Sequence, residues 1–173
     1  MRLHGSMNLQ IFSAINNLAG QSHILDVLGV FFADKFLYVF ALIILGLWLN
    51  KRLRPYVYLA FASTLIARGL IVEILKRIID HPRPYEIVGN IHQLLADNEH
   101  GMSFPSGHTV IFFSFAFSFW GTKYFWPFLI MAIIGSLARV FVGVHFPGDV
   151  MASILIAGLV VWLGRQLFQK KLA

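Results

Sequence analysis

Cysteine is absent from this chain of 173 residues, and charged residues make up only 13% of it. The lack of cysteine excludes disulfide bonds and thiolate metal sites. Soluble domains carry about 25% charged residues, so the low charge content argues against a water-soluble enzyme. The few charges are mostly basic, with a formal net charge of +6. No basic stripe interleaved with aromatic residues accompanies this excess, so we expect no nucleic acid among the partners.

Apolar residues fill the sequence instead, at 58% of the chain. A bilayer core about 30 Å thick takes roughly 20 apolar residues in a helix. Runs that meet or approach this length predict membrane spans at residues 36–49, 55–75, 107–120, 124–144 and 149–168. The expected fold class is therefore all-α, a polytopic transmembrane helical bundle.

The predicted number of spans is five or six, depending on the N-terminal region. Residues 24–33 either extend the span at 36–49 or form a sixth span of their own. Residues 7–21 carry several amide side chains, and this polarity favours a helix that lies in the membrane interface.

We expect the whole chain, residues 1–173, to form a single integral-membrane domain. Residues 1–6 precede a second methionine and are set aside from the functional argument. No apolar run near the start leads to a small-residue cleavage site, so no cleavable signal peptide is expected.

The basic residues other than Arg2 and Arg68 divide between the two ends of the predicted bundle. One end carries Lys51, Arg52, Arg54, Lys123, Arg165, Lys170 and Lys171, and the other carries Lys35, Lys76, Arg77, Arg83 and Arg139. The first end also has the four tryptophans, Trp48, Trp120, Trp126 and Trp162. Cytoplasmic loops are enriched in basic residues and tryptophans gather at membrane interfaces. The first end is therefore predicted to be cytoplasmic and the second extracytoplasmic.

Three polar segments stand out at the second end. In the first, Lys76 ends a predicted span and Arg83 follows seven residues later between two prolines. The residue before a proline disfavours the helical region, so Arg83 is expected in extended backbone. Arginine binds phosphate through two parallel contacts, and lysine adds a point charge. The alternative is that these cations only extend to the lipid headgroups.

The second segment, Pro105-Ser106-Gly107-His108, opens the short run at 107–120. Serine is a favoured N-cap, and the free N–H groups of a helix N-terminus bind anions. Glycine permits close backbone approach, and His108 projects from the first turn toward the same point. An ordinary capped helix is the alternative. Because 14 helical residues reach only about 21 Å, this first turn is expected to lie recessed in the membrane.

The third segment places Arg139 near the end of a span and then His145 and Asp149 four residues apart. A carboxylate at this spacing can hold one imidazole nitrogen and leave the other free to attack phosphorus. The alternative is a structural His–Asp pair that caps the last helix. If all three segments were purely structural, their polar residues would have come to the same end of the bundle by three independent coincidences. The segments together therefore predict a phosphate-transfer site.

These segments resemble the motifs of the type 2 phosphatidic acid phosphatase superfamily, which includes membrane lipid phosphatases and soluble vanadium haloperoxidases. The match runs in order from Lys76 to Asp149. One position departs from the family pattern, because Ala138 stands where a serine usually precedes the arginine. Ser136 lies two residues from that position and faces another side of a helix. One hydroxyl contact to phosphate is therefore expected to be missing.

The resemblance implies a role for each motif residue. It implies that His145 is the nucleophile that forms a phosphohistidine, that Asp149 orients it, and that His108 is the general acid and then the base. The implied phosphate-binding residues are Lys76, Arg83, Ser106, Gly107 and Arg139. No cofactor and no metal ion is implied, because the cations neutralise phosphate as Mg²⁺ does in kinases.

The implied activity is hydrolysis of a lipid phosphate in the bacterial cytoplasmic (inner) membrane, with membrane lipids as the other partners and the oligomeric state left open. The chain resembles the undecaprenyl-diphosphate phosphatase branch in general appearance. Phosphatidylglycerophosphate phosphatase and lipid A 1-phosphatase stay as alternatives, since the site would look alike in all three. The apolar spans argue against a haloperoxidase, and the intact histidines argue against a non-catalytic lipid-binding protein.

Two features lie outside the motifs. Arg68 and Glu73 are five residues apart on one predicted helix, so we expect them on different faces and paired with other helices. Asp26 and Asp34 are candidate partners. The phenylalanines of residues 107–120 are expected to pack in the core or against lipid, and a lining for a lipid tail is the alternative.

Overall fold

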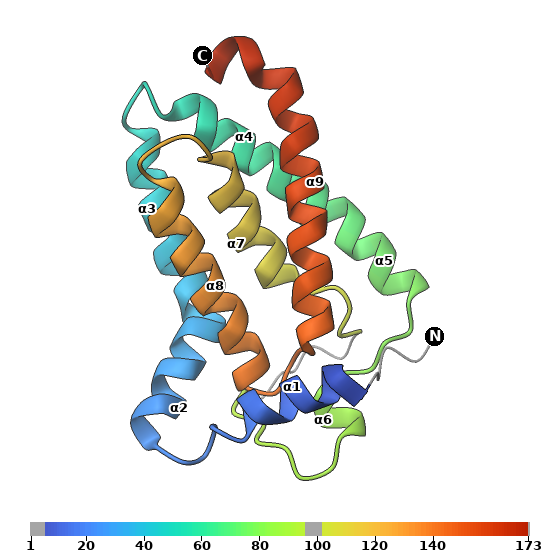
Figure 1. The fold of residues 1–173 in the computed structure, drawn as a ribbon. Helices are drawn as coiled ribbons and strands as arrows, with labels where there is room; N and C mark the ends of the chain where they lie inside the picture. The colour runs from blue at the N-terminus through green and yellow to red at the C-terminus, as the bar shows by residue number, and fades with distance from the viewer. Residues whose placement is uncertain (1–5, 96–101, 173) are drawn as a thin grey trace.

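The computed structural model describes residues 6–95 and 102–172, and all regular structure in these residues is helical (Figure 1). The elements are α1 (Ser6–Asn16), α2 (His23–Val30), η1 (Phe31–Lys35), α3 (Phe36–Trp48), α4 (Arg54–Thr64), η2 (Leu65–Val72), α5 (Glu73–Ile78), α6 (Pro84–Ile87), α7 (Gly107–Ser118), α8 (Phe125–Phe141) and α9 (Pro147–Leu172). The two elements labelled η are stretches of π-helix. The predicted all-α class is confirmed.

Several of these elements join end to end into longer rods. The continuous helices long and apolar enough to cross a membrane are His23–Trp48, Arg54–Ile78 and Pro147–Phe168, and α7 and α8 are shorter apolar helices. The first rod contains α2, η1 and α3, so residues 24–33 extend the span at 36–49. The alternative of a separate sixth span is wrong, because η1 continues the helix without a turn that would reverse the chain.

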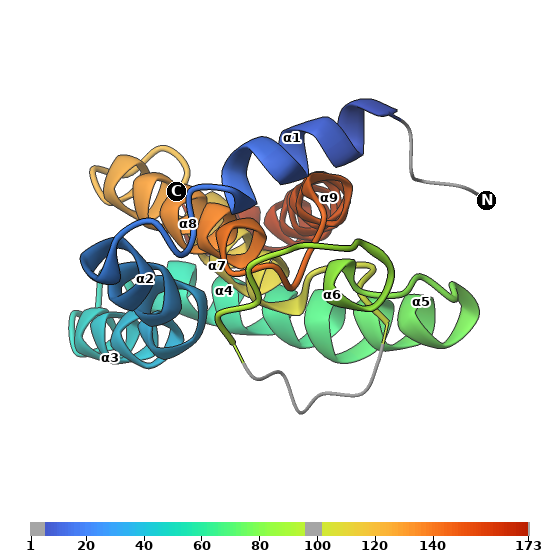
Figure 2. The ribbon, with the colours of Figure 1, turned by 90° about the horizontal axis from the view of Figure 1, so that it is seen from below.

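Helix α1 lies across the end of the bundle, against α8 and α9 (Figures 1 and 2). Its buried residues include Phe12, which packs on Phe146, and Asn16. The Asn16 amide donates to the carbonyls of His92 and Phe141, each at 2.8 Å. An 11-residue helix with this position agrees with the predicted interfacial element and holds the loop before α7 against the end of α8.

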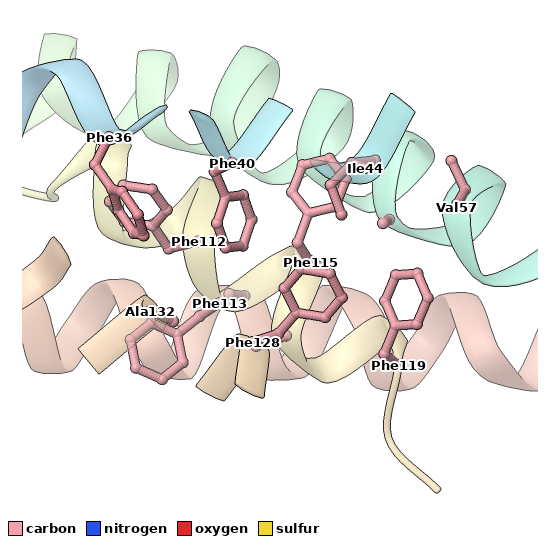
Figure 3. Close-up of a cluster of buried hydrophobic side chains, with 13 residues drawn as sticks. Phe36, Phe40, Ile44, Val57, Phe112, Phe113, Phe115, Phe119, Phe128 and Ala132 are labelled. Carbon is pink, nitrogen blue, oxygen red and sulfur yellow. The ribbon is translucent and has the colours of Figure 1, made fainter. Parts of the chain in front are cut away.

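Helix α7 is the centre of the bundle, with α8, α9 and α4 packed around it (Figure 1). A helix that is apolar on all sides is buried by its neighbours. Phe112 and Phe115 lie 5.3 and 5.7 Å from the ring of Phe40 on α3, and Phe119 lies 5.0 Å from Phe128 on α8 (Figure 3). Most phenylalanines in this helix therefore pack in the core. This was the expected role, and the lining for a lipid tail was the alternative.

The arrangement brings the three polar segments to one end of the molecule. The last turns of α5 and α8 and the first turns of α7 and α9 are the lower ends of these helices in Figure 1. The 12 residues of α7 extend only about 18 Å. Its first turn therefore lies within the thickness of a 30 Å hydrocarbon layer when its other end is at the opposite surface.

Candidate active site

A cavity of about 130 Å³ lies where these helix ends meet. Its lining is formed by Leu37, Arg68, Lys76, Arg83, Gly107, His108, Ile111, Arg139 and His145. Each of the three predicted segments contributes side chains to it. The cavity therefore combines four cations with two histidines in a small space that is largely shielded by the bundle.

Arg83 has the extended backbone that its flanking prolines predict, with φ −75° and ψ 156°. Its N–H donates to Glu86 Oε2 at 2.9 Å, which fixes the start of α6. The side chain is buried at 1% exposure, and its guanidinium lies 3.5 Å from the carbonyl oxygen of Val144. The alternative that Arg83 extends to lipid headgroups is wrong, because the side chain points into the bundle.

The other two predicted cations occupy the last turns of their helices, Lys76 on α5 and Arg139 on α8. Arg139 is 4% exposed, and it donates to the carbonyl of Ala33 at 3.1 Å. This contact ties α8 to the first rod. Cations near a helix C-terminus also interact favourably with the helix dipole, which helps to hold the charges at this depth.

His145 and Asp149 form a buried pair on the turn into α9. His145 Nδ1 lies 3.5 Å from Asp149 Oδ2, and the same oxygen accepts the N–H of Phe146 at 2.8 Å. Because Nδ1 faces the carboxylate, the other ring nitrogen is the one available to the cavity. Burial lowers the pKa of His145 to about 4, although the hydrogen bond with Asp149 acts in the opposite direction. The imidazole is therefore neutral at pH 7.

Ser103 and His81 join this pair, and neither was predicted from the sequence. The Ser103 hydroxyl donates to Asp149 Oδ2 and lies 3.4 Å from His145 Nδ1. Its backbone N–H donates to the carbonyl of His81 at 2.7 Å, and His81 Nδ1 lies 3.7 Å from Asp149 Oδ1. Ser103 stands two residues before Pro105, outside the predicted segment. Only its position next to Asp149 in the fold marks it.

The N-terminus of α7 supplies two of its three predicted residues to the cavity. Gly107 and His108 line it, whereas Ser106 does not. Ser106 is the N-cap, and its hydroxyl oxygen accepts from the N–H of Thr109 at 3.5 Å and from the Thr109 hydroxyl at 3.0 Å. The predicted capping role is confirmed, and phosphate binding by Ser106 stays a prediction.

Arg68 lines the cavity although it lies outside the three segments. The expectation that Arg68 and Glu73 face different ways is wrong, because they form an ion pair with each other. The reason is that Arg68 lies in η2, where π-helical hydrogen bonds join residues five apart and bring such residues to one face. A side-chain atom at Gly107 would lie 2.9 Å from Arg68 Cδ, so glycine is what lets Arg68 approach α7.

Ala138 is buried at 7% exposure in an apolar cluster with Ala33, Val142 and Val144. Neither Ala138 nor Ser136 lines the cavity. The structure therefore brings no serine hydroxyl from α8 to the site, in agreement with the expected missing contact.

A larger hollow of about 330 Å³ lies at the opposite end of α7 and α9, lined mainly by aromatic and aliphatic side chains. Its single cation, Arg165, donates to carbonyls at the end of α7, including that of Trp120 at 3.1 Å. The cations and histidines of the predicted segments therefore gather in the smaller cavity. Within residues 6–95 and 102–172, no group of three or more His, Cys, Asp or Glu side chains is placed to hold a metal ion.

The fold is that of a helical membrane protein, and its cavity gathers cations and histidines that suit an anionic ligand. The family model of the PAP2 superfamily matches residues 55–173, and the chain belongs to this superfamily. It is therefore a phosphatase, that is, a membrane-bound hydrolase that acts on lipid phosphates. This is the superfamily that the three segments resemble.

Known relatives and solved structures agree with this membership. Undecaprenyl-diphosphatase BcrC of Bacillus subtilis (strain 168) is 31% identical over 160 residues, which cover 91% of this chain and 82% of BcrC. The crystal structure of Aquifex aeolicus LpxE matches with a TM-score of 0.80 and 27% identity, over 92% of this chain and 95% of that one. A transmembrane PAP2 type phosphatidylglycerolphosphate phosphatase from Bacillus subtilis matches with a TM-score of 0.69 at 21% identity, over 97% of this chain and 89% of that one, and supports the fold alone.

Proposed function

We propose that this protein removes the terminal phosphate from a lipid diphosphate of the undecaprenyl diphosphate type, through a phosphohistidine intermediate. The observation that carries the proposal is the cavity in which cations and two histidines meet. Among the described residues that line it, none is acidic, and Asp149 stands behind His145. Such a site attracts an anion and places a neutral imidazole beside it.

The first chemical step follows from the positions of the two histidines. Lys76, Arg83 and Arg139 bind the terminal phosphate, together with the backbone N–H groups at the start of α7. The free ring nitrogen of His145 attacks phosphorus, while Asp149 holds Nδ1–H and stabilises the charge that develops on the ring. The bond to the leaving oxygen breaks, and His108 donates a proton to that oxygen.

The second step returns the enzyme to its starting state. His108, now neutral, takes a proton from a water molecule, and the water oxygen attacks phosphorus of the phosphohistidine. The phosphorus–nitrogen bond breaks, and inorganic phosphate leaves. The three cations stabilise the phosphoryl oxygens in both steps, so we expect the reaction to need no added metal ion.

The relative BcrC, which is named an undecaprenyl-diphosphatase and shares most of its length with this chain, supports the choice of lipid. We further propose that the enzyme resides in the bacterial cytoplasmic (inner) membrane, with the cavity facing the extracytoplasmic side. The support for this orientation is the excess of basic residues and the tryptophans at the other end.

The test is phosphate release by the purified protein in detergent, across undecaprenyl diphosphate, phosphatidylglycerophosphate and lipid A 1-phosphate. We expect the first substrate to give the highest kcat/KM, the activity to survive EDTA, and His145→Ala to abolish it. His92→Ala is the control, because His92 is an exposed residue of the loop before α7 and does not line the cavity. Faster release from another lipid would reassign the substrate, and full activity in His145→Ala would overturn the mechanism.

A further inference from the structure

Arg68 is the cation of the cavity that the proposed mechanism does not use. It lies in η2, in the middle of the continuous helix Arg54–Ile78 that is long and apolar enough to span a membrane. An ionisable side chain inside a membrane span is energetically costly, and it usually serves binding or transport. Glu73 supplies a counter-charge within the span, but Arg68 also lines the cavity. There it can bind a second negative charge on the ligand, beyond the one that the other three cations bind.

The position of Arg68 places it on the His108 side of the cavity. Its side chain lies against the backbone of Gly107, the residue immediately before His108. His145 enters the cavity from the turn before α9, on another element. His108 is the proposed donor to the leaving oxygen, so Arg68 lies next to the part of the substrate that departs.

The depth of Arg68 points to the same conclusion. Lys76 lies eight residues further along the same rod, which is about two helical turns nearer to the active-site end. The side chains of Arg68 and Glu73 are 33% and 43% exposed, so this wall of the cavity meets the outside of the bundle. In a membrane that outside is lipid, from which the hydrocarbon part of a lipid substrate must enter.

We propose that Arg68 binds the second phosphate of a lipid diphosphate and thereby selects diphosphates over monophosphates. This inference rests on the proposed function. When His145 attacks the terminal phosphorus, the bond to the bridging oxygen breaks and the lipid monophosphate leaves with its charge. His108 protonates the bridging oxygen, and Arg68 neutralises the remaining charge on the departing phosphate. With a lipid monophosphate as substrate, the leaving group is an alcohol and offers Arg68 no anion.

Glu73 is a positioning residue in this scheme. Its ion pair with Arg68 is made possible by the five-residue spacing of the π-helix. The pair holds the guanidinium toward α7 and lessens the cost of a lone cation in the span. The π-helical stretch thus has a function, since in a regular α-helix residues five apart face different ways.

The experiment compares farnesyl diphosphate with farnesyl monophosphate, which share one lipid tail, in the wild type, Arg68→Gln and Arg68→Lys. We expect Arg68→Gln to lower the ratio of kcat/KM for the diphosphate to kcat/KM for the monophosphate by about 10- to 100-fold, the range for a lost hydrogen bond to a charged group. Arg68→Lys should recover part of the ratio because it keeps the charge. Arg77→Gln is the matched control, an exposed cation on the same rod that does not line the cavity.

A binding measurement tests the same role where a variant or a substrate turns over too slowly for kcat/KM to be measured. The inhibition constant of a non-hydrolysable methylene diphosphonate should rise at least tenfold in Arg68→Gln, whereas that of vanadate, which fills only the terminal phosphate position, should change less than threefold. Equal changes for both inhibitors, or for both substrates, would overturn the role of Arg68. An absence of His145-dependent phosphate release in the wild type would instead overturn the proposed function, and this inference with it.

Discussion

At the scale of single residues, the site depends on how firmly His145 is held. Asp149 accepts hydrogen bonds from the Ser103 hydroxyl and the Phe146 N–H, so its carboxylate is fixed before it meets the imidazole. A carboxylate that is itself anchored restricts the imidazole to one orientation and one tautomer. The backbone bond from Ser103 to His81 extends this anchoring to the segment that carries Arg83.

Ser103 is therefore predicted to be a positioning residue for catalysis. Ser103→Ala should lower kcat by about 10- to 100-fold, because a hydrogen bond to a charged group contributes about 1.5–3 kcal/mol. KM should stay within a factor of about three, since Ser103 does not line the cavity. Steady-state kinetics on one lipid diphosphate measure both constants.

The matched control is Ser136→Ala, an equally buried serine whose hydroxyl has no hydrogen-bond partner among the described residues. It should leave kcat and KM near the wild-type values. A rise in KM with unchanged kcat for Ser103→Ala would contradict the positioning role.

At the scale of elements, the position of His108 depends on how α7 packs against α8. Gly135 of α8 faces Phe112, and an added methyl group would lie 2.6 Å from Phe112 Cε2. Phe112 is fully buried against Phe36 and Phe40, so it has no room to move away (Figure 3). The contact thus sets the distance between the two helices one turn of α7 beyond His108, further into the bundle.

Gly135→Ala is predicted to lower the free energy of unfolding by about 1–3 kcal/mol, the usual cost of overpacking a filled core. Gly46→Ala is the control, because nothing lies within 4 Å of an added methyl group there. Alanine is favoured over glycine in a helix, so this control should match or slightly exceed the wild type. Thermal unfolding of the three proteins in the same detergent tests the pair, and equal stability of Gly135→Ala and wild type would refute the packing argument.

The helices also show which features could be predicted from the sequence and which could not. The membrane spans could be predicted from the lengths of the apolar runs. The N-cap at Ser106 and the extended backbone of Arg83 could be predicted too, because capping and the steric effect of proline act between neighbouring residues. The ion pair of Arg68 with Glu73 could not, because the switch from α- to π-helical hydrogen bonding leaves no mark in the apolar periodicity. Ser103 was also missed, since its role arises from a contact with Asp149, 46 residues away.

At the scale of the whole molecule, the bundle has the cavity lined by cations at one end and the tryptophans Trp48, Trp120, Trp126 and Trp162 toward the other. The side chains that line the cavity come from segments between Leu37 and His145, and α1 lies across that end of the bundle (Figure 2). A core rich in phenylalanines packs between the two ends. The orientation of the bundle then decides which leaflet supplies the substrate.

The orientation is predicted to place the loop before α7 outside the cytoplasm. The chain contains no cysteine, so single cysteines can be introduced on a silent background at the exposed residues Gln93 and Lys123. Gln93→Cys should react with a membrane-impermeant maleimide in intact cells, and Lys123→Cys should react only after permeabilisation. The reverse pattern would place the site in the cytoplasm.

The central claim is that His145 carries the phosphoryl group, and trapping that group tests it most directly. The purified enzyme is mixed with a lipid diphosphate radiolabelled in its terminal phosphate and quenched in alkali, under which phosphohistidine survives. We predict that the wild type carries a label that acid removes. His108→Ala should become labelled more slowly, and His145→Ala should carry no label. A label that persists in His145→Ala, or that resists acid, would contradict the account.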